Sequence, residues 1–82
     1  MFIRLSDSDY RMAATAEVAG FHATYPYAFT PDNPLTEWQL WSDAIDWCGN
    51  HLDNSAWEIS KYELLLVFRR ESDAFAFRLR WC

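Results

Sequence analysis

The chain has 82 residues, a hydrophobic fraction of 51% and a net charge of −5. This length predicts a single compact domain spanning residues 1–82, and the scarcity of Gly and Pro argues against disorder. No apolar run approaches the roughly 18 residues that a membrane span requires, and the apolar stretch at the N-terminus is too short for a signal peptide. These features predict a cytoplasmic protein that does not bind a membrane.

The first part of the chain predicts a strand, a helix and a connection. Residues 1–5 (MFIRL) are rich in β-favouring side chains and predict a short strand. Ser6 followed by Asp9 resembles a capping box, which predicts the start of a helix that Gly20 then ends. Residues 21–35 contain all three prolines and predict a connection, whose aromatic side chains pack onto the fold or face a partner.

The clearest predicted element is an amphipathic helix over residues 36–52. With about 100° per residue, Trp41 and Cys48 fall in the middle of a wide apolar arc, which predicts that both lie in the core. Trp38 and Trp47 lie at opposite edges of this arc, about 180° apart, and are expected to be half-packed. The opposite side of the helix is polar and acidic.

The last part of the chain predicts two strands. Residues 57–70 (WEISKYELLLVFRR) have β-branched and aromatic side chains around an apolar centre, which is typical of a long strand. After a turn at residues 71–73, large apolar side chains alternate over residues 74–81 (AFAFRLRW) and predict a second strand. The competing interpretation is a helix that begins at Ser72, a favourable N-cap.

Together these elements predict an α+β fold with the order β-α-α-β-β. Two amphipathic helices then cover one face of a small three-stranded antiparallel sheet. Because a chain of this length buries a limited fraction of its surface, its five Trp, four Tyr and six Phe are expected to fill much of the core.

The charges are segregated along the chain. Residues 12–60 contain no Lys or Arg and carry seven acids, whereas residues 61–82 carry five basic residues against three acids. A segment of one sign creates a directed field, which argues against direct nucleic-acid binding through that segment. The segregation favours a partner protein with a basic surface.

The acidic side of the helix over residues 36–52, with the loop before it, is the candidate contact surface. Its carboxylates recur at helical spacing and can pair with cations of a partner, while nearby aromatic side chains can act as apolar anchors. The predicted contact residues are Glu37, Asp43, Asp46, Asp53, Trp47 and Tyr27. If the partner binds DNA, the carboxylates would mimic phosphates; alternatively, they form only a solvated helix face.

Metal binding and catalysis are the less favoured functions. A Cys2His2 zinc set could be drawn from His22, Cys48, His51 and Cys82, but no pair has the compact spacing of a zinc finger. Cys48 and His51 could also form a nucleophile and base, yet nothing supplies an oxyanion hole or a phosphate cradle. The sequence therefore predicts no enzymatic activity, no cofactor and no metal.

The main alternative is a basic and aromatic C-terminal sheet that binds single-stranded nucleic acid. It would use Arg69, Arg70, Arg78, Arg80, Tyr62, Phe75 and Phe77. The net charge of −5 favours the simpler arrangement, in which the arginines face water and the aromatic rings face the helices.

The tail FRRESDAFAFRLRW resembles a closing pattern of small proteins encoded by tailed bacteriophages. The pattern comprises Phe68, Asp73-Ala74, Phe77, Leu79 and Trp81. The resemblance implies an acidic, single-domain, non-enzymatic protein that binds one bacterial host protein, as an inhibitor of a host enzyme or defence complex. It assigns no functional residue, because the pattern looks structural. The expected function is therefore protein–protein binding, as an inhibitor or modulator.

Overall fold

The computed structural model describes residues 1–13, 20–60 and 64–82, and within them four strands form one antiparallel sheet. The strands are β1 (Phe2–Arg4), β2 (Tyr27–Pro31), β3 (Trp57–Ser60) and β4 (Leu65–Phe68), and the helices are α1 (Asp7–Ala13), α2 (Phe21–Thr24), α3 (Trp38–His51) and α4 (Glu71–Trp81). The strand order across the sheet is β1-β2-β4-β3.

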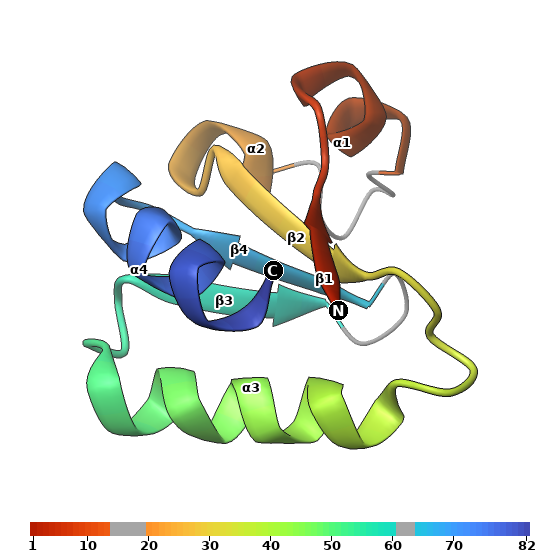
Figure 1. The fold of residues 1–82 in the computed structure, drawn as a ribbon. Helices are drawn as coiled ribbons and strands as arrows, with labels where there is room; N and C mark the ends of the chain where they lie inside the picture. Colours follow the sequence, from red (N-terminus) through yellow and green to blue (C-terminus); the bar gives the residue numbers. More distant parts are fainter. Residues whose placement is uncertain (14–19, 61–63) are drawn as a thin grey trace.

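Helices cover both faces of the sheet (Figure 1). α3 and α4 pack on one face, and α1 and α2 lie on the other. The α+β class is confirmed, but the predicted three-stranded sheet with two helices on a single face is wrong. The element order along the described chain is β-α-α-β-α-β-β-α.

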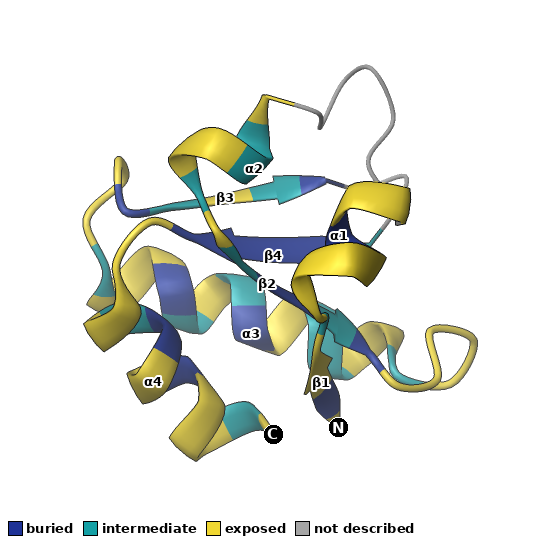
Figure 2. Cartoon of the chain, turned by 90° about the horizontal axis from the view of Figure 1, so that it is seen from above, coloured by how far each residue is buried: buried dark blue, intermediate teal, exposed yellow. Residues whose placement is uncertain are grey.

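Strand β4 shows why both faces need a covering. All four of its residues are buried, and the strand lies between β2 and β3 (Figure 2). Leu66 and Phe68 join the core on the α3/α4 side, whereas Leu65 and Val67 join the core on the α1/α2 side. Successive side chains of a strand point to opposite faces, so this uninterrupted apolar run fills both cores.

The long strand predicted over residues 57–70 is wrong, because two antiparallel strands occupy this stretch. β3 and β4 pair from Trp57 opposite Phe68 to Ser60 opposite Leu65. Just before β4, Leu64 has a φ of 53°, a left-handed conformation that an extended strand does not contain. Residues 61–63, within the predicted strand, lie outside the described part of the chain.

Part of the predicted connection is the interior strand β2. Tyr27 and Phe29 contribute to the α3/α4 side, and Ala28 to the other side, so the segment alternates as a strand does. Pro31 lies at the strand's end, opposite Phe2. Prolines usually mark turns or edge strands. In this segment they made the strand-like alternation of residues 27–31 hard to recognise in the sequence.

Residues 71–81 form the helix α4, so the predicted strand over residues 74–81 is wrong and the competing interpretation of a helix is confirmed, although the N-cap is Arg70 and not Ser72. At helical spacing, Ala74, Phe77 and Trp81 face the sheet, whereas Phe75 is 60% exposed. Acids in the first turn and arginines in the last turn complement the helix dipole. The alternation of phenylalanines therefore did not mark a buried face.

The N-terminal elements confirm part of the prediction. β1 is a strand, and the Ser6 hydroxyl accepts a hydrogen bond from the Asp9 N–H at 3.1 Å, as a capping residue does at the start of α1. The continuation of this helix falls on residues 14–19, which lie outside the described residues. Gly20 was predicted to end the helix, but it is the N-cap of α2 with a φ of −72°.

The amphipathic helix predicted over residues 36–52 is confirmed as α3. Ala44 and Cys48 are buried against the sheet, and the Trp41 ring stacks on the ring of Phe2, with centroids 6.4 Å apart. Trp41 and Cys48 thus belong to the core, as the helical spacing predicts. No helix in the described ranges has both the length and the apolar character needed to cross a bilayer.

Candidate functional site

The outer side of α3 carries two of the predicted contact residues. Asp43 and Asp46 are exposed, and Asp43 accepts a hydrogen bond from the Gln39 amide at 2.9 Å. Within the described residues, neither carboxylate forms an ion pair. The described part of the chain therefore leaves both carboxylates open to a partner.

The other two predicted acids have roles within the fold. Asp53 lies in the turn after α3, is exposed and accepts a hydrogen bond from the Ser55 hydroxyl at 3.1 Å. The Glu37 side chain is only 18% exposed and forms an ion pair with the amino group of Met1. Glu37 also accepts a hydrogen bond from the Asn33 N–H at 2.8 Å. The Met1 amino group and this N–H hold the pKa of Glu37 below its ordinary value, so its carboxylate is already engaged.

Trp47 is packed between α3 and α4. Its ring stacks on His51 at a centroid distance of 5.0 Å and meets the rings of Phe77 at 6.2 Å and Trp81 at 6.4 Å. Trp38, at the other edge of the apolar arc, is 67% exposed. The exposed tryptophan of this helix is therefore Trp38. The sequence treats the two rings as equivalent edges, and the position of α4 alone distinguishes them.

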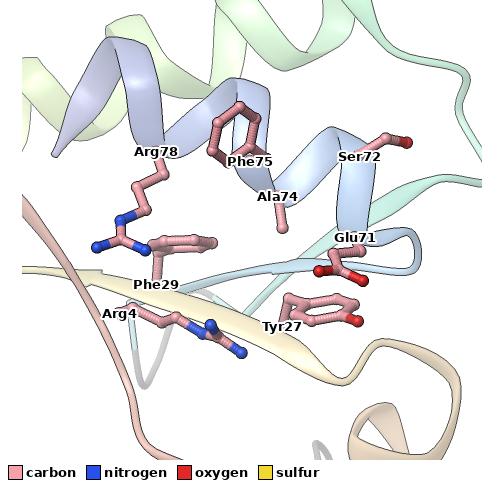
Figure 3. Close-up of a pocket in the computed structure, with 8 residues that line it drawn as sticks. All are labelled: Arg4, Tyr27, Phe29, Glu71, Ser72, Ala74, Phe75 and Arg78. Carbon is pink, nitrogen blue, oxygen red and sulfur yellow. The ribbon is translucent and has the colours of Figure 1, made fainter.

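Tyr27 lies away from α3's acidic side, in a pocket between α4 and strands β1 and β2 (Figure 3). The Arg4 guanidinium lies over its ring, 5.3 Å from the centroid. Arg78 extends toward the same pocket from α4. The six predicted contact residues thus do not form one surface. The structure brings together the acids of α3 and places Tyr27 in a second, basic site, which the sequence analysis missed.

The basic and aromatic sheet of the alternative function is absent from the described structure. Phe75, Arg78 and Arg80 lie on a helix, and Phe77 is fully buried. Tyr62 lies outside the described residues. Because single-strand binding proteins stack bases on exposed rings along a groove, this arrangement does not supply the predicted surface.

The candidate metal ligands are dispersed. Cys48 lies on the buried side of α3, Cys82 is exposed, and His22 lies on α2 at the opposite face of the sheet. The Nδ1 atom of His51 lies 2.9 Å from the Trp47 carbonyl oxygen. Across the described ranges, no three side chains of His, Cys, Asp or Glu converge as a metal site would require. Burial, with a smaller contribution from the Asp73 charge, raises the pKa of the Cys48 thiol to about 12, which makes it a poor nucleophile.

Two surfaces therefore remain as candidates: the exposed side of α3 and the pocket between the sheet and α4. The first combines Trp38 with exposed carboxylates, and the second combines arginines with aromatic rings. Comparisons of the chain with models of protein families, with curated proteins and with solved structures find no significant match.

Proposed function

We propose that this protein acts by binding another protein through the outer side of α3, as a small inhibitor or modulator without enzymatic activity. The proposed contact surface consists of Trp38, Asp43 and Asp46, extended by Asp53 beyond the helix. The partner presents a basic surface with an apolar recess. The resemblance of the tail to tailed-phage proteins supports a bacterial host protein as the partner and the host cytoplasm as the location.

The observation that carries this proposal is the exposure of Trp38 on the same helix as the exposed carboxylates Asp43 and Asp46. Single exposed apolar side chains are common on proteins, but tryptophan offers the largest apolar area and is enriched among interface hot spots. Trp38 is 67% exposed at the start of α3, and the exposed Asp43 and Asp46 follow further along the same helix. An anchor flanked by charges is the usual composition of a binding patch.

The carboxylates supply orientation and speed of association. Across the described residues, Asp43, Asp46 and Asp53 have no ion-pair partner, and the chain has a pI near 4.7. Complementary charges steer encounter and exclude wrong partners more than they add affinity. If the partner binds DNA, the spaced carboxylates pair with the basic side chains that otherwise bind DNA phosphates.

The proposal is tested by affinity capture from a bacterial lysate, with bound proteins identified by mass spectrometry. Asp43→Lys combined with Asp46→Lys reverses the charge of α3 and is expected to abolish capture of the specific partner. Trp38→Ala is expected to weaken binding of the identified partner by about thirtyfold or more, as for a central hot spot. Binding should also fall as salt rises, because exposed charges are screened.

The matched control is Asp32→Lys combined with Glu58→Lys, which changes net charge by the same amount at exposed positions away from α3. This control should retain the partner. If the α3 variant and the control capture the same proteins as the unmodified chain, the acidic side of α3 is only a solvated helix face and the proposal is wrong.

A further inference from the structure

A pocket of about 550 Å³ lies between α4 and strands β1 and β2. This volume falls within the range of small-molecule sites, roughly 300–1,000 Å³. Its lining residues are Arg4, Tyr27, Phe29, Glu71, Ser72, Ala74, Phe75 and Arg78. None of them belongs to α3, so the pocket is independent of the surface proposed above.

Two arginines from distant parts of the sequence line this pocket. Arg4 comes from β1 and Arg78 from α4, and both side chains extend into the space between these elements (Figure 3). In the described portion of the chain, neither guanidinium forms an ion pair. Two unneutralised cations at a partly enclosed surface create a positive potential that favours an anion, and guanidinium groups bind carboxylate and phosphate through paired hydrogen bonds.

The walls suit a planar apolar group. Tyr27 and Phe29 come from β2, and Phe75 is 60% exposed although it is a large aromatic residue. Arg4 already lies over the Tyr27 ring, which places a cation beside an aromatic surface. A flat ring bound here would cover the apolar surface of Phe75, which is exposed to water in the unbound protein.

Glu71 limits the charge that the pocket accepts. Its carboxylate lies near Tyr27 at the start of α4 (Figure 3), where among the described residues it has no ion-pair partner. With two arginines and one glutamate, the lining has a net charge of +1. A ligand with one anionic group therefore fits better than a polyanion such as a nucleic-acid strand.

From these observations we infer that the pocket binds a small organic anion that consists of one phosphate or carboxylate group attached to a planar ring. The anionic group contacts Arg4 and Arg78, and the ring packs on the exposed Phe75 side chain and against the edge of Tyr27, whose face the Arg4 guanidinium covers. Glu71 faces the end of the ring that carries hydrogen-bond donors. The two arginines supply affinity for the charge, and the aromatic walls select the ring.

The inference is tested by NMR titration of the full chain with four probes: AMP, benzoate, adenosine and inorganic phosphate. AMP tests a phosphate and benzoate tests a carboxylate. At least one of them should shift the resonances of Tyr27, Phe75 and the Arg4 and Arg78 Nε–H groups in a saturable manner. Adenosine and inorganic phosphate, which each lack one of the two features, should bind at least about tenfold more weakly than the better of the two.

Matched variants separate the pocket from general electrostatic attraction. Arg78→Gln should weaken binding about tenfold or more, whereas Arg69→Gln, an exposed arginine outside the pocket, should leave it unchanged. Phe75→Ala should weaken binding, whereas Leu79→Ala, one turn along the same helix and 73% exposed, should not. These side chains are exposed, and the spectra themselves report whether each variant is folded.

Two results would overturn the inference. One is the absence of saturable shifts with both AMP and benzoate at millimolar concentration. The other is an equal loss of binding in Arg69→Gln and Arg78→Gln, because this would show diffuse attraction to positive charge rather than a site.

Discussion

The two faces of the sheet bury different kinds of side chain. On the α3/α4 face, the buried core contains Phe2, Phe29, Phe68 and Phe77. On the α1/α2 face, it contains Tyr10 with the smaller Ala28, Leu65 and Val67. The aromatic face therefore buries more apolar area, and the longest helices cover it. Both candidate binding surfaces are carried by these two well-supported helices.

Polar contacts hold the other face together. α2 has only four residues, and a helix of this length is not stable alone. The Tyr10 hydroxyl donates a hydrogen bond to the Tyr25 carbonyl at 3.0 Å, and Asp7 pairs with His22 of α2 at 2.5 Å. The difference indicates that burial of apolar area stabilises the α3/α4 face, whereas hydrogen bonds and an ion pair position α1 and α2 on the other face.

The largest expected effect is that of Phe77→Ala on the aromatic face. Phe77 is 0% exposed, and its ring lies 4.9–6.3 Å from those of Phe68, Phe29, Phe2, Trp47 and Trp81. The cavity should lower the free energy of unfolding by about 3–5 kcal/mol, measured by chemical denaturation. Phe75→Ala, two residues away and exposed, should change it by less than about 1 kcal/mol. Similar losses in both variants would show that α4 does not pack as described.

Cysteine alkylation tests whether α3 stays docked on the same face. Burial raises the pKa of Cys48 to about 12, whereas Cys82 is exposed. Because the thiolate is the reactive species, iodoacetamide at about pH 8 should label Cys82 first and Cys48 at least about a hundredfold more slowly. Intact-mass measurement over time gives the two rates, and Cys82→Ser isolates the slow one. In denaturant the two thiols should react alike; similar rates in the native protein would mean that α3 opens readily.

On the polar face, Tyr10→Phe is expected to have a moderate effect. Tyr10 is buried, and burial raises the pKa of its hydroxyl to about 12. Removing the hydroxyl leaves the Tyr25 carbonyl without this donor, which should lower the free energy of unfolding by about 1 kcal/mol, measured from the denaturation midpoint. Tyr25→Phe is the control, because the Tyr25 carbonyl and not its hydroxyl accepts the bond. An unchanged midpoint in Tyr10→Phe would show that the hydrogen bond from Tyr10 to the Tyr25 carbonyl does not stabilise the fold.

The smallest expected effect concerns the pH dependence contributed by Asp7. The hydrogen bond to His22, followed by the charge of Arg11, lowers the pKa of Asp7 below its ordinary value of 3.8. In the window between the lowered and the ordinary pKa, the unfolded chain binds more protons, so stability from this pair falls as pH falls and is complete above the ordinary value. Asp7→Asn should flatten the fall of the denaturation midpoint in acid. Asp9→Asn, in the same helical turn, should keep it; equal flattening in both would contradict the assignment to the His22 pair.

Local periodicity was a reliable guide where one helix packs against one surface. The spacing of Trp41 and Cys48 predicted the buried side of α3, and the charge layout predicted its acidic outer side. The same reasoning failed for residues 74–81, because alternating phenylalanines satisfy a strand, while Ala74, Phe77 and Trp81 satisfy a helix equally well. Small alanines at buried positions carry little signal, so the helical pattern is less visible in this segment than the alternation of phenylalanines.

The basic pocket could not be predicted from spacing within the sequence. Arg4 and Arg78 are far apart along the chain and meet only because α4 packs beside β1 and β2. Tyr27, which the sequence groups with the acidic side of α3, lies instead in the lining of this pocket. Prolines around β2 hid the strand that positions it, since a proline near a strand usually signals a turn.

The sequence by itself determined what depends on neighbours along the chain: the amphipathic pattern of α3, the apolar run of β4 and the segregation of charge. Tertiary structure alone decided what depends on packing between distant segments. The position of α4 partly covers Trp47 and leaves Trp38 exposed, and the pairing of β1 with β2 brings Arg4 over Tyr27. Periodicity shows which side of a helix or strand is apolar. Which neighbouring element packs against each edge of that side depends on the free energy of the whole fold.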